Sequence, residues 1–138
     1  MIDNLFRGKV SADYGDYLEC GDWIEGYYVC LNDKEHRIYT GYAETDCGDY
    51  YPDWFNVVPE TVGRCTEMED ENGVEIFEGD IIYRNWHGGR TYQVTYDNLT
   101  GGFIGVTADE CLTTFDGDSD FFEVIGNIYD NPELLSKN

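Results

Sequence analysis

The chain has 138 residues, of which 29 are acidic and 8 are basic, so its formal net charge is −21. This length suits one compact domain or two small subdomains. Aromatic residues make up 16% of the chain, which excludes a disordered acidic protein because such proteins are poor in aromatic residues. The charge disfavours direct binding to nucleic acid or to an anionic membrane and favours a basic partner. Roughly 2–8 charges keep a small domain soluble, so we expect a further cause, such as halophily, a metal or a basic partner.

Short apolar runs separated by glycine-rich turns predict strands along most of the chain. In the N-terminal half, we expect strands on both sides of Gly21-Asp22 and a third in HRIYTGY, residues 36–42. Residues 44–54, ETDCGDYYPDW, are expected to form a loop with an aromatic tip. A short strand then leads to a turn at Pro59.

The C-terminal half has a clearer strand pattern. Asn72-Gly73 predicts a hairpin turn, and residues 109–120 are expected to be a polar excursion. The other predicted strands are GDIIYRN (79–85), TYQVTYD (91–97), FIGVT (103–107) and FFEVIGNIYD (121–130).

Local chemistry assigns roles to several residues of this half. We expect Ile76, Ile81 and Tyr83 to enter a core from consecutive strands. Glu78-Gly79-Asp80 is expected to form a tight turn in which Asp80 accepts hydrogen bonds from backbone N–H groups. Asn131 is expected to cap a helical turn that begins at Pro132. Several short strands with glycine turns indicate a mostly β fold, α+β at most, built as a small barrel or a strongly bent sheet.

The five cysteines, Cys20, Cys30, Cys47, Cys65 and Cys111, form no C-x-x-C pair. Neither His36 nor His87 has zinc-site spacing to a pair of them, so we expect scattered reduced thiols. A cysteine partnered by one of these histidines stays open as a catalytic pair. Phosphate-loop and G-x-S-x-G motifs are absent, and no pair of carboxylates is singled out. We therefore expect no enzyme, no catalytic residue, no cofactor and no metal site.

Two long blocks resemble the YopX family of phage and prophage proteins. They are VVPETVGRCTEMEDENGVEIFEGDII, residues 57–82, and FFEVIGNIYDNPELL, residues 121–135. The openings FRGKV and GDWIEGYYV are also similar to the family pattern. The resemblance covers about two-thirds of the chain. It implies a phage or prophage product with a β-rich N-terminal subdomain, residues 1–58, and an SH3-like barrel, residues 59–138.

The departures from the family pattern concern charge. Glu69 and Glu71 stand where the family tends to have lysine, and Val74 replaces a third lysine. We expect the acids that match the pattern, Glu75, Glu78 and Asp80, to be structural, because turn acids commonly bind the backbone. The added acids are expected to lie on the surface.

The favoured function is a phage-encoded inhibitor of a host nucleic-acid enzyme or defence system, such as an anti-CRISPR, that acts in the host cytoplasm. Its carboxylates would imitate nucleic acid in the basic groove of the host protein. Tyr50, Tyr51, Phe55, Phe115, Phe121 and Phe122 interleave with the acids and could anchor an interface. The expected partner-binding residues are Glu67, Glu69, Asp70, Glu71, Asp49, Asp53, Asp116, Asp118, Asp120 and Trp54.

The alternative is an oligomeric assembly or small-ligand-binding module of phage origin without inhibitory activity. The turn between Arg84 and Arg90 is the one place where positive charge flanks an aromatic residue, Trp86. No apolar run reaches the ~20 residues of a membrane span. The sequence leaves open whether the protein forms a homo-oligomer.

We predict that folding requires no divalent metal. The acidic segment DGDSD, residues 116–120, starts like a calcium loop but has Phe121 at the sixth position and Asn127 at the twelfth. Addition of EDTA should therefore leave the melting temperature unchanged in a calorimetric scan. A drop of several degrees would contradict the prediction.

Overall fold

The computed structural model describes residues 5–14, 18–44, 46–48, 50–85, 89–114 and 122–135; for 42–44 and 50–52 it describes the backbone only. The chain divides into two compact units, residues 1–64 and 65–138. The division follows Arg64 rather than Val58. Thr61 Oγ1 accepts a hydrogen bond from the Lys9 backbone N–H (2.9 Å), and Arg64 is paired with Phe6. These contacts tie residues 59–64 to the first unit.

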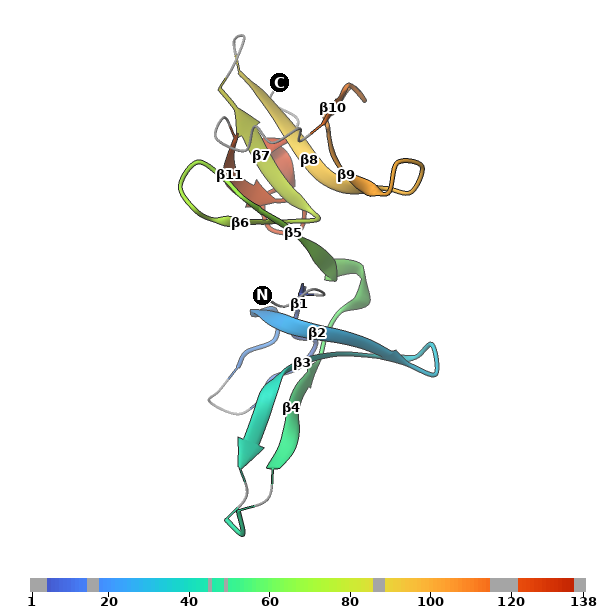
Figure 1. Cartoon of the computed structure of the whole chain (residues 1–138), viewed down its shortest axis with the longest axis vertical. Coiled ribbons are helices and arrows are strands. Elements are labelled where there is room, and N and C mark those ends of the chain that lie inside the picture. Colours follow the sequence, from blue (N-terminus) through green and yellow to red (C-terminus); the bar gives the residue numbers. More distant parts are fainter. Residues whose placement is uncertain are drawn as a thin grey trace. The chain divides into compact units, whose positions relative to one another are not determined.

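The first unit is an antiparallel sheet with the order β4-β3-β2-β1-β5. Its elements are β1 (Phe6–Lys9), β2 (Trp23–Leu31), β3 (Glu35–Glu44), β4 (Tyr50–Asn56), the 3-10 turn η1 (Pro59–Thr61) and the start of β5 (Gly63–Glu69). β2 pairs with β3 only over residues 35–39 of β3, so the outer part of β3 and β4 continues as a two-stranded ribbon (Figure 1).

The core of this unit lies on one face of β1, β3 and β4. Val10, Ile38, Phe55 and Val57 are buried there. Gly26 of β2 is required for close packing, because a Cβ atom at this position would lie 2.1 Å from the Tyr39 carbonyl oxygen. The alternation of buried and exposed residues along the strands places the opposite face in solvent.

The predicted loop at residues 44–54 is wrong over its second half, because Tyr50–Asn56 is strand β4. Pro52 and the polar residues around it resemble a loop in sequence. A strand tolerates proline at the edge of a sheet, where its missing N–H faces solvent. β4 occupies that position in the order of strands.

The second unit combines the rest of β5 with a five-stranded antiparallel sheet in the order β10-β9-β8-β7-β11. Its elements are β6 (Glu75–Phe77), β7 (Asp80–Arg84), β8 (Arg90–Asp97), β9 (Gly102–Val106), β10 (Leu112–Thr114), β11 (Phe122–Asn127) and the 3-10 turn η3 (Pro132–Leu134) (Figure 1). The mostly β prediction is confirmed. β10 lies in the predicted polar excursion.

The sheet of the second unit does not close into the expected barrel within the described residues. The outer edge of β11 is covered by the turn that follows β5. The Glu71 N–H donates to the Phe122 carbonyl (3.0 Å), and the Val124 N–H donates to Asp70 Oδ2 (2.9 Å). Because these groups are already bonded, they are not available to pair with β10.

Ile76, Ile82, Tyr92, Val94 and Phe122 form the core of the second unit. Ile76 and Ile81 are buried as predicted, but Tyr83 is 36% exposed. The run Ile81-Ile82 is covered on both faces of β7, whereas residue 83 lies beyond the core. The Tyr83 ring lies over the turn at Gly89 instead.

The turn Glu78-Gly79-Asp80 is confirmed. Gly79 has a φ of +95°, and Asp80 Oδ2 accepts a hydrogen bond from the Phe77 N–H (2.7 Å). Gly79 also donates to the Val94 carbonyl and accepts from the Ile128 N–H. The turn therefore connects the two sequence blocks that carry the family resemblance.

As predicted, Asn131 occupies the N-cap position of η3 and Pro132 begins that turn. The Asn131 side chain makes no capping bond to η3. Its Oδ1 accepts from the Asn127 N–H (3.3 Å) instead, next to Gly126. The preceding turn is closed by Asn127 Oδ1, which accepts from the N–H groups of Tyr129 and Asp130.

We predict that Gly79→Ala destabilises the protein more than Gly101→Ala. Both glycines have positive φ values, +95° and +74°, so both substitutions introduce backbone strain of about 1–2 kcal/mol. A Cβ atom at residue 79 would also lie 3.1 Å from the Tyr129 ring, whereas at residue 101 the nearest side-chain atom is 3.9 Å away. Urea unfolding of both variants measures the difference. Equal losses of unfolding free energy in the two variants would show that the Tyr129 ring moves aside without destabilising the protein.

Candidate partner-binding surfaces

The β5–β6 hairpin positions the acidic residues of the second unit. Along β5, Thr66 is buried and Met68 is half-buried, whereas Glu67 and Glu69 point to solvent. β5 bulges between Cys65 and Glu69. Inside the bulge, the Thr66 hydroxyl donates to the Ile76 carbonyl (2.7 Å) and accepts from the Met68 N–H (3.1 Å). The threonine therefore replaces ladder hydrogen bonds and fixes the outward direction of the glutamates.

Asp70 belongs to the interior, although the sequence suggested a partner-binding role. It is only 6% exposed, and Oδ1 accepts from the N–H groups of Asn72 and Val74, both at 2.9 Å. Oδ2 accepts from the Val124 N–H (2.9 Å). Burial acts to raise the pKa of Asp70, but these three donors outweigh it and lower the pKa below 3.8. The Asp70 carboxylate is therefore already bound to three backbone N–H groups and is not free to bind a partner.

The exposed carboxylates of the hairpin come from Glu67, Glu69, Glu71 and Glu75. Glu69 and Glu75 are direct cross-strand partners. Like charges at opposed positions destabilise a strand pair. Glu75 was expected to be structural; it is exposed, and its Oε2 accepts a hydrogen bond from the Cys65 thiol (3.9 Å). We name these four residues the acidic hairpin surface.

Trp54 lies in the first unit, on the solvent face of β3 and β4. It is opposite Tyr39, and the Arg37 guanidinium lies 3.7 Å from the centroid of its ring. Arg37 also forms a 2.7 Å ion pair with Glu35. Tyr27 of β2, opposite Tyr39, is 52% exposed. Trp54 is therefore half-buried under a cation and shares its face with an exposed tyrosine.

The remaining expected residues do not form one surface with these. Asp53 is half-buried in β4, opposite Gly41. Phe55 and Phe122 are buried in the cores, so they cannot anchor a partner. Several expected residues lie outside the described residues: Asp49, Phe115, Asp116, Asp118, Asp120 and Phe121; for Tyr50 and Tyr51, only the backbone is described.

Arg84, the first arginine of the proposed ligand turn, has internal partners. Arg84 donates to Thr113 Oγ1 (3.2 Å) and lies 5.6 Å from the centroid of the Phe122 ring. Arg90 is the cross-strand partner of Arg84. Trp86 and His87 lie outside the described residues. Arg84 therefore contributes to packing of the sheet.

The sequence left open a catalytic cysteine–histidine pair, and the strand register places one cysteine opposite one histidine. Cys30 and His36 are cross-strand partners at the β2–β3 hairpin, and the Tyr28 hydroxyl lies 2.6 Å from His36 Nδ1. The hairpin turn at Asn32-Asp33, where both residues have a φ of +55°, sets this register. Asn-Asp is a turn signal, so it could have indicated the pairing.

Other kinds of site have less support in the described part of the chain. It contains no group of three His, Cys, Asp or Glu side chains arranged to hold a metal ion. No helix among these residues has the length and apolar character needed to cross a bilayer.

Comparisons with known proteins agree with the fold. The model of the YopX family, described as YopX protein, matches residues 17–136. The crystal structure of protein EF1440 from Enterococcus faecalis is similar, with a TM-score of 0.62 and 23% identity over 98% of this chain and 99% of that chain. At this identity the likeness supports the fold alone. No curated protein matches the chain.

We predict that Asp70→Asn lowers the free energy of unfolding by about 1.5–3 kcal/mol at pH 7, because an amide has one acceptor oxygen for three N–H donors. The pKa of Asp70 is lowered in the folded state, so its ionised form stabilises the protein above the ordinary value of 3.8. That contribution is lost as the pH falls through the lower folded-state pKa.

Urea unfolding of wild type and variant between pH 7 and pH 2 tests this expectation. Glu71→Gln, an exposed neighbour, serves as the control and should change stability by less than about 0.5 kcal/mol. A pH-independent difference between wild type and Asp70→Asn would show that the charge of Asp70 does not matter.

Proposed function

The chain belongs to the YopX family, which supports a phage-type protein, and we propose that it is a phage-encoded, non-catalytic inhibitor of a host nucleic-acid enzyme. Its acidic hairpin surface enters the basic groove that otherwise binds nucleic acid. Such a target would be a nuclease or a component of host defence, including a CRISPR effector. The protein acts in the host cytoplasm.

The observation that carries this proposal is the Glu69–Glu75 pair. The fold does not require two carboxylates at opposed positions, because such a pair destabilises the hairpin. Lysine or arginine side chains of a partner placed between them would remove the repulsion. Glu67 and Glu71, exposed on the same hairpin, extend the negative charge beyond the pair.

The charge of the whole chain supports the same partner. The second unit has 16 acidic and 3 basic residues, and the first has 13 and 5. A polyanion of this kind repels DNA and RNA but accelerates the approach of a basic protein. Carboxylates that displace the counterions of a basic groove gain the same salt-dependent free energy that drives protein–DNA association.

Charge reversal on the hairpin tests the proposal, because stability and affinity should change in opposite directions. The variant combines Glu69→Lys, Glu71→Lys and Val74→Lys; all three positions are exposed. Lysine at residue 69 faces Glu75 and replaces repulsion with attraction, worth about 0.2–1 kcal/mol. The variant should therefore be at least as stable as wild type, while its affinity for the partner falls at least about tenfold.

The partner is first captured from a host lysate and eluted with a salt gradient, and binding is then titrated at two salt concentrations with and without DNA. A control variant with the same change in net charge carries Glu19→Lys, Glu60→Lys and Leu99→Lys, at exposed positions that are not part of the hairpin. The proposal requires competition by DNA and a larger loss in the hairpin variant. Equal losses in both variants, or binding that salt and DNA leave unchanged, would refute it.

A further inference from the structure

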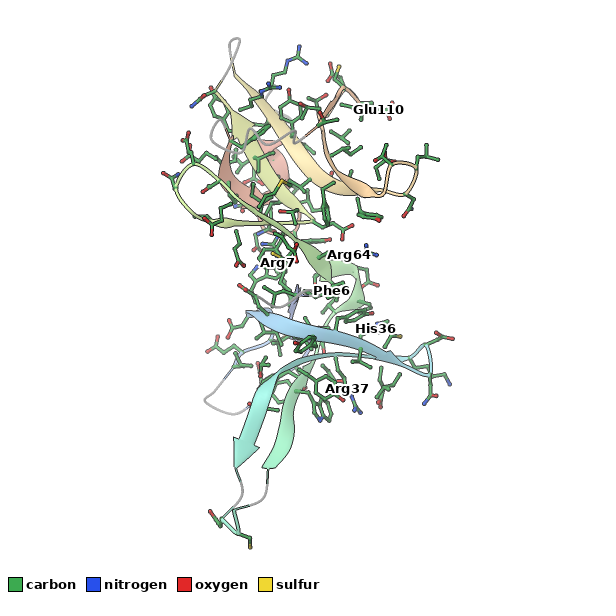
Figure 2. The ribbon with its side chains drawn as sticks, in the orientation of Figure 1. Phe6, Arg7, His36, Arg37, Arg64 and Glu110 are labelled. Carbon is green, nitrogen blue, oxygen red and sulfur yellow. The ribbon has the colours of Figure 1, made fainter. Side chains whose placement is uncertain are left out.

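Asn72 and Gly73 lie at the tip of the hairpin formed by β5 and β6. Both residues are exposed, and Figure 2 shows side chains of this turn projecting away from the ribbon. Asn72 is the only asparagine of the chain that a glycine follows. Because glycine has no side chain, its nitrogen can approach the preceding side chain without steric hindrance. The tip is therefore the place where an asparagine can react with its own backbone.

The reaction is a deamidation that needs only water. The Gly73 nitrogen loses its proton and bonds to the side-chain amide carbon of Asn72, and the amide nitrogen takes up a proton and leaves as ammonia. The product is a cyclic imide. Water then breaks the bond between the nitrogen and one of the two imide carbonyls, which leaves either an aspartate or an isoaspartate. Each product carries a negative charge that asparagine lacks.

Asp70 holds the peptide groups on both sides of Asn72. The Asn72 N–H donates to Asp70 Oδ1 (2.9 Å), and the Gly73 N–H donates to the Asp70 carbonyl (3.0 Å). Oδ1 also accepts from the Val74 N–H (2.9 Å). Imide formation requires the Gly73 nitrogen to give up its proton and to turn toward the Asn72 side chain. Both changes break the hydrogen bond to Asp70, so the reaction requires local opening of the turn.

The acidic surroundings of the tip oppose the same step. The Gly73 nitrogen becomes negatively charged before it attacks, and nearby charges of the same sign disfavour a negative charge. Glu71 directly precedes Asn72, and Glu69 Oε2 lies 3.9 Å from the position that a Cβ atom at residue 73 would occupy. The exposed carboxylates therefore add to the protection that the hydrogen bonds provide.

We propose that Asn72 is a site of spontaneous deamidation that the hydrogen bonds to Asp70 protect in the folded protein. Opening of the turn exposes the site to reaction. Deamidation adds a carboxylate to the tip of the hairpin that carries the acidic hairpin surface. In the isoaspartate form the main chain is longer by one carbon atom, so the hydrogen bonds to Asp70 no longer fit. This modification does not depend on the proposed inhibitory function.

The test is the rate of deamidation at each asparagine, measured by peptide mass spectrometry after incubation at mildly alkaline pH. Wild type is compared in native buffer and unfolded in urea at the same pH and temperature. In the unfolded chain Asn72 should react faster than every other asparagine, because it alone precedes a glycine. In the folded chain its rate should be lower by at least about tenfold, because opening the turn breaks several hydrogen bonds.

Two variants test whether Asp70 provides the protection. Asp70→Asn removes one acceptor oxygen from the turn, so folded variant should deamidate at Asn72 at least about tenfold faster than folded wild type. Glu71→Gln removes an exposed charge beside Asn72 and keeps all the acceptors, so it is the matched control. Its rate should exceed that of wild type by less than about fivefold, because exposed charges interact weakly.

Equal rates at Asn72 in folded and unfolded wild type would overturn the proposal, as would faster deamidation of another asparagine in the unfolded chain. An unchanged rate in folded Asp70→Asn would overturn it as well. If circular dichroism shows that Asp70→Asn is unfolded, the comparison of wild type with and without urea decides.

Discussion

The buried carboxylate of Asp70 joins two parts of the second unit that are 54 residues apart in sequence. Oδ1 closes the turn between β5 and β6, and Oδ2 binds the backbone of β11 at Val124. Without this carboxylate, the N–H groups of Asn72, Val74 and Val124 lose their acceptor, and a buried polar group left without a partner costs about 1–3 kcal/mol. The position of the turn, and with it the direction of the exposed glutamates, depends on this side chain.

The dense acidic stretch from Glu67 to Asp80 therefore contains two kinds of carboxylate. Asp70 and Asp80 are buried and accept backbone hydrogen bonds, so they specify the two turns. The glutamates at 67, 69, 71 and 75 are exposed, and the fold gains no stability from the opposed pair. The buried aspartates therefore hold the turns rigid, and the exposed glutamates face the solvent and its counterions. Charge recognition requires such a fixed array of exposed charges.

The sequence predicted features that arise from neighbouring residues. The Asn72-Gly73 turn and the hydrogen bond from Phe77 to Asp80 span at most three residues, so local chemistry is sufficient. It could not predict the bond between Asp70 and Val124, because burial of Asp70 results from long-range packing. The sequence did not predict β4, because a strand can contain Pro52 only at the edge of a sheet. Whether a strand lies at an edge is determined by the order of strands in the sheet. The pairing of Cys30 with His36 depends on the register of β2 and β3, and a shift of one residue would remove this pairing.

The cover that the Asp70 turn provides along β11 has a consequence for association between chains. An exposed strand edge is a template for strand addition and aggregation. At β11, a carboxylate and a peptide N–H occupy bonding positions that another strand would use. The opposite edge, β10, has only three residues and offers a short template. The second unit therefore resists uncontrolled polymerisation through its sheet edges by the same contacts that determine its fold.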